Sequence, residues 1–89
     1  MATMTKLSTM TWPSSEAQDQ PAVNGPRTTY IDDAFAGNTT DQLAAIKLSP
    51  TISTRKWVDQ AAADAWKTFI TNLATEAGTS VTVDITDII

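Results

Sequence analysis

The segment Asp59-Gln-Ala-Ala-Ala-Asp-Ala-Trp-Lys-Thr-Phe-Ile-Thr-Asn-Leu-Ala-Thr-Glu-Ala-Gly78 decides the fold that we expect for this chain. Between its two ends it contains neither Gly nor Pro, and its larger apolar side chains recur at spacings of three and four, as one face of an α-helix requires. Asp59 is a suitable N-cap, and Gly78 stands where a left-handed residue commonly ends a helix. The pattern predicts an amphipathic helix over residues 60–77.

The segments on either side of this helix have the pattern of β-strands. Residues 51–57 (TISTRKW) are rich in β-branched side chains and follow Pro50. In residues 80–86 (SVTVDIT), apolar side chains alternate with polar ones, which is typical of a strand with one buried face. The chain is therefore expected to be an α+β protein in which one amphipathic helix packs on a small sheet, as a strand–helix–strand unit over residues 51–87. If both strands lie parallel in one sheet, their connection should be right-handed. The expected core consists of Trp57, Ala62, Trp66, Phe69, Ile70, Leu73, Val81, Val83 and Ile85.

The N-terminal part of the chain shows no such period. Residues 1–27 hold three of the four prolines, and the Asn-Gly-Pro at their end is a turn signal. We therefore expect an extended arm over residues 1–27, followed by a small α+β domain over residues 28–89. Within that domain, residues 28–32 resemble a short strand. Residues 41–47 fit either a short helix capped by Thr40 or an extended segment.

Composition excludes several classes of function. The 89 residues include no His and no Cys, so thiol nucleophiles, zinc sites of the usual types and the commonest general base are missing. The net charge is −4, and the six Lys and Arg residues are scattered, which argues against nucleic-acid binding. The adjacent pair Asp32-Asp33 is expected to be a solvated turn rather than a metal site. We expect no enzymatic activity, cofactor, metal or small-molecule substrate, and the chain shows no signal peptide or membrane-spanning run.

The small size of the chain indicates that it is part of an assembly. Without the arm, about 60 residues remain, and a domain of that size usually needs disulfides, a metal or a partner to be stable. Sixteen Thr and six Ser give a surface of low charge, which costs less to bury against a neighbour than a charged one. Trp12 can cover either a neighbouring subunit or the chain's own sheet, and we expect the neighbour. The residues expected to make protein contacts are Met4, Leu7, Met10, Trp12, Pro13, Ile88 and Ile89.

The stretch TRKWVDQAAADAWKTFI (residues 54–70), continued by VTVDI (residues 81–85), resembles small proteins of tailed bacteriophages, in particular those that infect marine cyanobacteria. The resemblance covers about 40 residues and carries over no functional residue. It implies a structural or assembly protein of the virion, assembled in the host cytoplasm. We expect this protein to bind other virion subunits or copies of itself through its arm and its sheet edge. The alternative is a free adaptor or host-modulating regulatory protein. If the chain is a virion protein, deletion of residues 1–27 would leave the remaining module soluble but abolish assembly.

Overall fold

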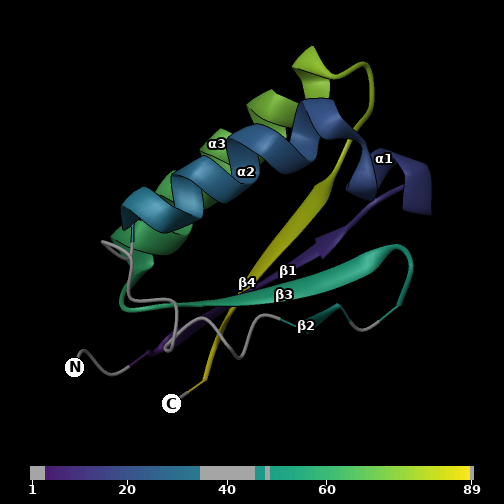
Figure 1. The fold of residues 1–89 in the computed structure, drawn as a ribbon. Helices are drawn as coiled ribbons and strands as arrows, with labels where there is room; N and C mark the ends of the chain where they lie inside the picture. The colour runs from purple at the N-terminus through teal and green to yellow at the C-terminus, as the bar shows by residue number, and fades with distance from the viewer. Residues whose placement is uncertain (1–3, 35–45, 48, 89) are drawn as a thin grey trace.

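The structure is a computed structural model, and it describes residues 4–34, 46–47 and 49–88. Three helices and four strands follow one another along the described chain (Figure 1). In order, they are β1 (Lys6–Thr11), α1 (Ser15–Asp19), α2 (Pro21–Ala34), β2 (Ile46–Lys47), β3 (Ile52–Trp57), α3 (Gln60–Glu76) and β4 (Thr82–Asp87). The chain is an α+β protein, as the sequence predicted.

The sheet has the strand order β2-β3-β1-β4, and every neighbouring pair is antiparallel. β3 and β4 are therefore parallel to each other, with β1 inserted between them. In the same way, β1 and β2 are parallel, with β3 between them. Two split β-α-β units thus interlock, which is the β-α-β-β-α-β arrangement of ferredoxin-like folds. The described part of the first connection contains two helices. The helices lie together on one side of the sheet (Figure 1).

The expected strand–helix–strand unit is present. The Asp59 side chain accepts a hydrogen bond from Ala62 N at 2.8 Å, so Asp59 caps α3 as predicted. Gly78 follows the helix with φ of 79°, the left-handed conformation that favours glycine. The strands of the unit are not adjacent, however, because β1 separates them.

The structure contradicts the prediction of an extended arm over residues 1–27. Residues Lys6–Thr11 form β1, which pairs along its whole length with β3 on one side and β4 on the other. Met10 on β1 is 1% exposed, and Trp12 just after the strand is 3% exposed. Both side chains belong to the core of this chain. Trp12 therefore covers its own sheet, and the expectation that it contacts a neighbour was wrong.

The segment that follows β1 is helical rather than extended. Ser14 caps α1 by accepting a hydrogen bond from Ala17 N at 3.1 Å, and Pro21 occupies the first position of α2, where its missing N–H costs nothing. α2 continues through Pro26 because Val23 and Ile31, eight residues apart, are both buried on the side facing the core. Tertiary packing thus overrides a local helix breaker. The strand expected over residues 28–32 is part of this helix, and Asp32-Asp33 is an exposed pair near its end.

The helix expected over residues 41–47 falls mostly outside the described residues. Ile46–Lys47 form β2, in agreement with the extended alternative.

The core lies between the helices and the sheet. Of the nine expected core residues, Trp57, Trp66, Ile70, Leu73 and Val83 are buried, and Ala62, Phe69, Val81 and Ile85 are partly buried against them. The buried residues that the sequence reading did not place in the core are Met10, Trp12, Ala17, Val23, Ile31, Ala63 and Ala74. Four of these seven residues lie within residues 1–27, which were expected to be an extended arm: Met10, Trp12, Ala17 and Val23.

Candidate interaction surface

The register assigns each strand residue to one of the two sides of the sheet. Ser8 accepts a hydrogen bond at 3.0 Å from Trp57 Nε1 and lies in the core beneath the helices. Because side chains alternate along a strand, the neighbours of Ser8 on β1 point to the opposite side. We call this opposite side the open face, since the helices of the described chain all lie on the other side (Figure 1). On β1, β3 and β4 the open face consists of Leu7, Thr9, Thr11, Ile52, Thr54, Lys56, Thr82, Asp84 and Thr86.

The open face is rich in threonine and carries no net charge. Five of its nine side chains are Thr, two are aliphatic, and Lys56 and Asp84 contribute opposite charges. The threonines lie directly opposite one another at Thr9–Thr54 and at Thr11–Thr82. Thr11, Thr82, Asp84 and Thr86 are exposed, Thr54 is 8% exposed, and the other four members are partly buried. The most accessible part of the face therefore lies over β4 and the end of β1.

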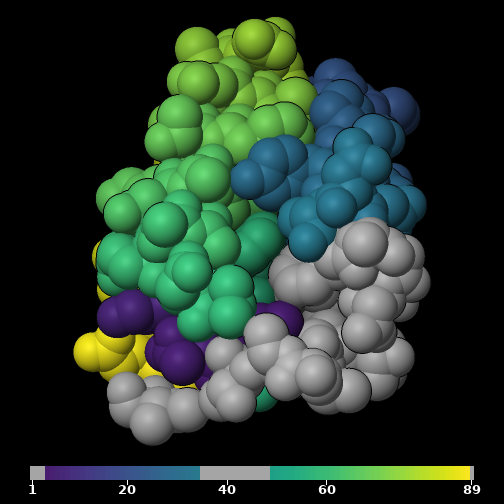
Figure 2. All heavy atoms as spheres, turned by 90° about the vertical axis from the view of Figure 1, so that its left-hand side faces the viewer, coloured from purple at the N-terminus to yellow at the C-terminus, as the bar shows by residue number. Residues whose placement is uncertain are grey.

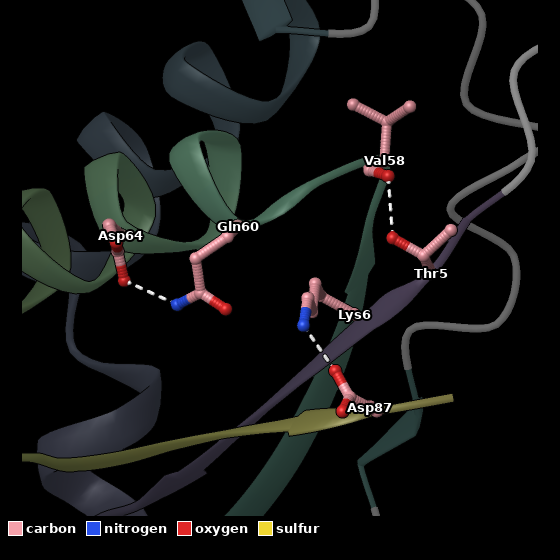
Figure 3. A network of polar contacts seen from close by, with 6 residues as sticks. All are labelled: Thr5, Lys6, Val58, Gln60, Asp64 and Asp87. Atoms are coloured by element: carbon pink, nitrogen blue, oxygen red, sulfur yellow. Dashed lines mark hydrogen bonds and ion pairs between the residues drawn. The ribbon is translucent and has the colours of Figure 1, made fainter. Parts of the chain in front are cut away.

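A group of polar contacts ties the ends of the three long strands together (Figure 3). Lys6 Nζ of β1 forms an ion pair with Asp87 of β4, and Thr5 Oγ1 donates a hydrogen bond to the Val58 carbonyl at 2.7 Å. Ile88 N donates to the Thr5 carbonyl at 2.9 Å. Each of these groups is used to hold the start of β1 between its two neighbours, which is a structural role.

Two arginines lie in the helix-covered side of the molecule. The Arg55 guanidinium lies 5.5 Å from the centre of the Trp66 ring, a cation–π distance. Burial and the nearby charge of Arg27 lower the pKa of Arg55 to about 10. Burial also lowers the pKa of Arg27, which the charge of Asp19 partly opposes. Arg55 thus brings its positive charge into contact with the Trp66 ring on this side of the molecule.

The three tryptophans differ in how their indole N–H groups are satisfied. Trp57 donates to Ser8 Oγ, and Trp66 donates to Met10 Sδ at 3.2 Å. Trp12 Nε1 is buried and has no hydrogen-bond partner among the described residues. An unsatisfied buried donor costs about 1–3 kcal/mol. Trp12 thus contributes apolar contact, while its N–H group gains no hydrogen bond from the described residues.

This difference predicts that two identical substitutions will have unequal effects. Trp12→Phe removes an N–H group that has no hydrogen-bond partner in the described part of the chain, whereas Trp57→Phe removes the donor to Ser8. We expect Trp57→Phe to lower the free energy of unfolding by about 1–2 kcal/mol more than Trp12→Phe does. Urea denaturation followed by far-UV circular dichroism measures both values. Equal losses, or a larger loss for Trp12→Phe, would contradict the assignment of the N–H groups.

In the structure, the residues expected to make protein contacts lie in different parts of the molecule and do not form one surface. Met10 and Trp12 are in the core, Met4 is partly buried, and Pro13 is exposed. Leu7 lies on the open face and is partly buried. Ile88 is 40% exposed beside the end of β4, and Ile89 lies outside the described residues. The open face itself was missed, because its composition becomes visible only when the register of β1 is known.

No protein-family model matches the chain, and neither a curated protein nor a solved structure with significant similarity was found. In the described part of the chain, no helix combines the length and the apolar character needed to span a bilayer. The same described residues contain no group of three or more acidic side chains arranged to hold a metal ion.

Proposed function

We propose that this chain is a non-enzymatic assembly module that binds a neighbouring subunit through the open face of its sheet. The observation that carries the proposal is the composition of that face, with five threonines, two aliphatic side chains and one charge of each sign. A threonine hydroxyl costs far less to remove from water than a charge. Its β-branched side chain also has few rotamers to lose on binding.

We propose that this module is part of the particle of a tailed bacteriophage. The resemblance of residues 54–70 and 81–85 to small phage proteins supports this placement, and so does the small, disulfide-free fold. The absence of His and Cys from the sequence supports a role without catalysis. The partner is another virion subunit with a flat surface of matching low charge. The sequence predicted this contact at the arm and the sheet edge, and the proposal places it on the open face of the sheet instead.

The test combines particle composition with charge substitutions. Mass spectrometry should find the chain in purified particles, and cross-links to its partner should fall around the open face. Thr11→Lys and Thr82→Lys each place a charge on an exposed part of that face. Each is expected to reduce incorporation at least tenfold, because an unpaired charge would have to be buried at the contact.

Thr68→Lys and Thr71→Lys on the exposed side of α3 are the matched controls, and these should incorporate normally. Absence of the chain from purified particles would overturn the placement in a virion and would favour a free adaptor. Normal incorporation of the Thr11 and Thr82 variants would overturn the open face as the contact.

A further inference from the structure

β4 is an edge strand with an unpaired outer side. It is the last strand in the order β2-β3-β1-β4, and no strand of the described chain pairs with its other side. Figure 2 shows the C-terminal residues, in yellow, at the surface beside the purple residues of β1. An unpaired strand edge is a template for pairing with another chain.

The hydrogen bonds of β1 identify which groups of β4 face outward. Trp12 N bonds to Thr51 O at the start of β3, so the even-numbered residues of β1 direct their backbone groups to β3 and the odd-numbered ones to β4. Thr82, Asp84 and Thr86 lie opposite those odd-numbered residues and therefore bond to β1. The bond from Ile88 N to Thr5 O continues the same series. The backbone groups that face outward are those of Val83, Ile85 and Asp87.

Natural sheets protect such an edge with charged side chains, especially lysine, with proline, a bulge or a very short strand, or by covering it with a helix or loop. β4 is six residues long, pairs with β1 without a bulge, and contains neither Pro nor Lys. Of its two acidic side chains, Asp87 is already paired with Lys6 of the same chain. The edge therefore has the length and regularity that strand pairing needs.

Charge selects one register for pairing with a second copy. In an antiparallel pair related by a two-fold axis perpendicular to the sheet, one residue must lie opposite its own counterpart. Only two such registers, centred on Asp84 or on Ile85, overlap most of β4. The first places the two Asp84 carboxylates directly opposite each other, which is destabilising. The second places Asp84 opposite Thr86, whose hydroxyl can donate to the carboxylate.

We propose that two copies of this chain pair antiparallel through β4, with Ile85 at the two-fold axis. In this register, the outward groups of Ile85 bond to those of the other Ile85, and those of Val83 bond to those of Asp87. Thr82 then lies opposite Ile88, which is 40% exposed in the single chain and becomes covered. The inference concerns the edge of the sheet and does not depend on the proposed function of its open face.

The register can be tested on the full chain by sedimentation equilibrium across micromolar to millimolar concentrations. The wild-type chain is expected to form dimers. Thr86→Asp should weaken dimerisation at least tenfold, because it places a second carboxylate opposite Asp84 on each side of the axis. Thr82→Asp makes the same change in charge on the same exposed strand face but lies opposite Ile88, so its dimerisation should remain close to that of the wild type.

A swap of the two side chains gives the decisive control. The double variant Asp84→Thr, Thr86→Asp has the composition and charge of the wild type and restores an Asp–Thr pair on each side of the axis, so it should dimerise like the wild type. Circular dichroism confirms that each variant is folded. A wild-type chain that stays monomeric up to millimolar concentration would overturn the proposal. So would equal weakening by Thr86→Asp and Thr82→Asp, or failure of the swap to restore dimers. None of these results would affect the test of the open face, which measures incorporation into particles.

Discussion

Deletion of residues 1–11 is expected to unfold the chain. β1 is the only described strand that joins β3 to β4, so its loss leaves β4 with no partner among the described strands. The deletion also removes Met10, which fills the core beneath α3 and accepts the hydrogen bond from Trp66. The loss should exceed the total stability of a domain of this size, about 5–15 kcal/mol. Far-UV and near-UV circular dichroism should show loss of fixed tertiary structure.

Two neighbouring point variants test the same conclusion without shortening the chain. Met10→Lys buries an unpaired ammonium at a site that is 1% exposed and should cost more than about 4 kcal/mol. Thr11→Lys changes the adjacent residue, which is exposed on the open face, and should stay within about 0.5 kcal/mol of the wild type. If the deletion variant unfolds cooperatively like the full chain, or if the two lysine variants are equally stable, β1 is not the central strand.

Trp66→Ala should be the most damaging truncation of a single core side chain. Trp66 is fully buried, and its ring centroid lies 5.4 Å from that of Trp57, 5.6 Å from that of Tyr30 and 6.0 Å from that of Phe69. The substitution removes these contacts and leaves a cavity, for which losses of about 3–5 kcal/mol are typical. A loss of that size should lower the melting temperature by more than about 12 °C.

The matched control for this substitution is the next residue along α3. Lys67 is exposed, so Lys67→Ala should change the free energy of unfolding by no more than about 0.5 kcal/mol. Urea denaturation of both variants provides the comparison. A loss below about 1 kcal/mol for Trp66→Ala, against the typical range for large core truncations, would mean that the aromatic cluster does not hold the helices on the sheet.

The helix and strands of the C-terminal half could be predicted from the sequence because the signals for them are local. α3 has an N-cap residue, one apolar face and a left-handed glycine after its end, all within a short stretch of sequence. In β4, apolar side chains alternate with polar ones. β1 was missed because its alternation is inverted, with Ser8 buried and Leu7 on the open face. A buried serine fits there only because Trp57 donates to its hydroxyl, which in turn donates to the Arg55 carbonyl. These hydrogen bonds depend on β3, which is far away in the sequence, so the residues around Ser8 give no sign of them.

α2 was missed for a different reason. Gly25 and Pro26 are strong local signals for a turn, and the two buried residues that support the helix lie one on each side of them. The candidate surface was equally hidden, since five threonines spread over three distant strands become one face only in the folded register. The high threonine content is visible in the sequence, but nothing in the order of the residues indicates where those side chains gather.

The position of β1 has a consequence for the order of events during synthesis. Among the described strands, the first one made, β1, pairs with the last one made, β4, and the ion pair between Lys6 and Asp87 joins residues 81 positions apart. The sheet therefore cannot close until β4 has been made. Closure over such a distance is slow because the entropy of the loop must be lost before the contacts form. Until β1 and β4 pair, the sheet lacks the contact that joins the two ends of the described fold.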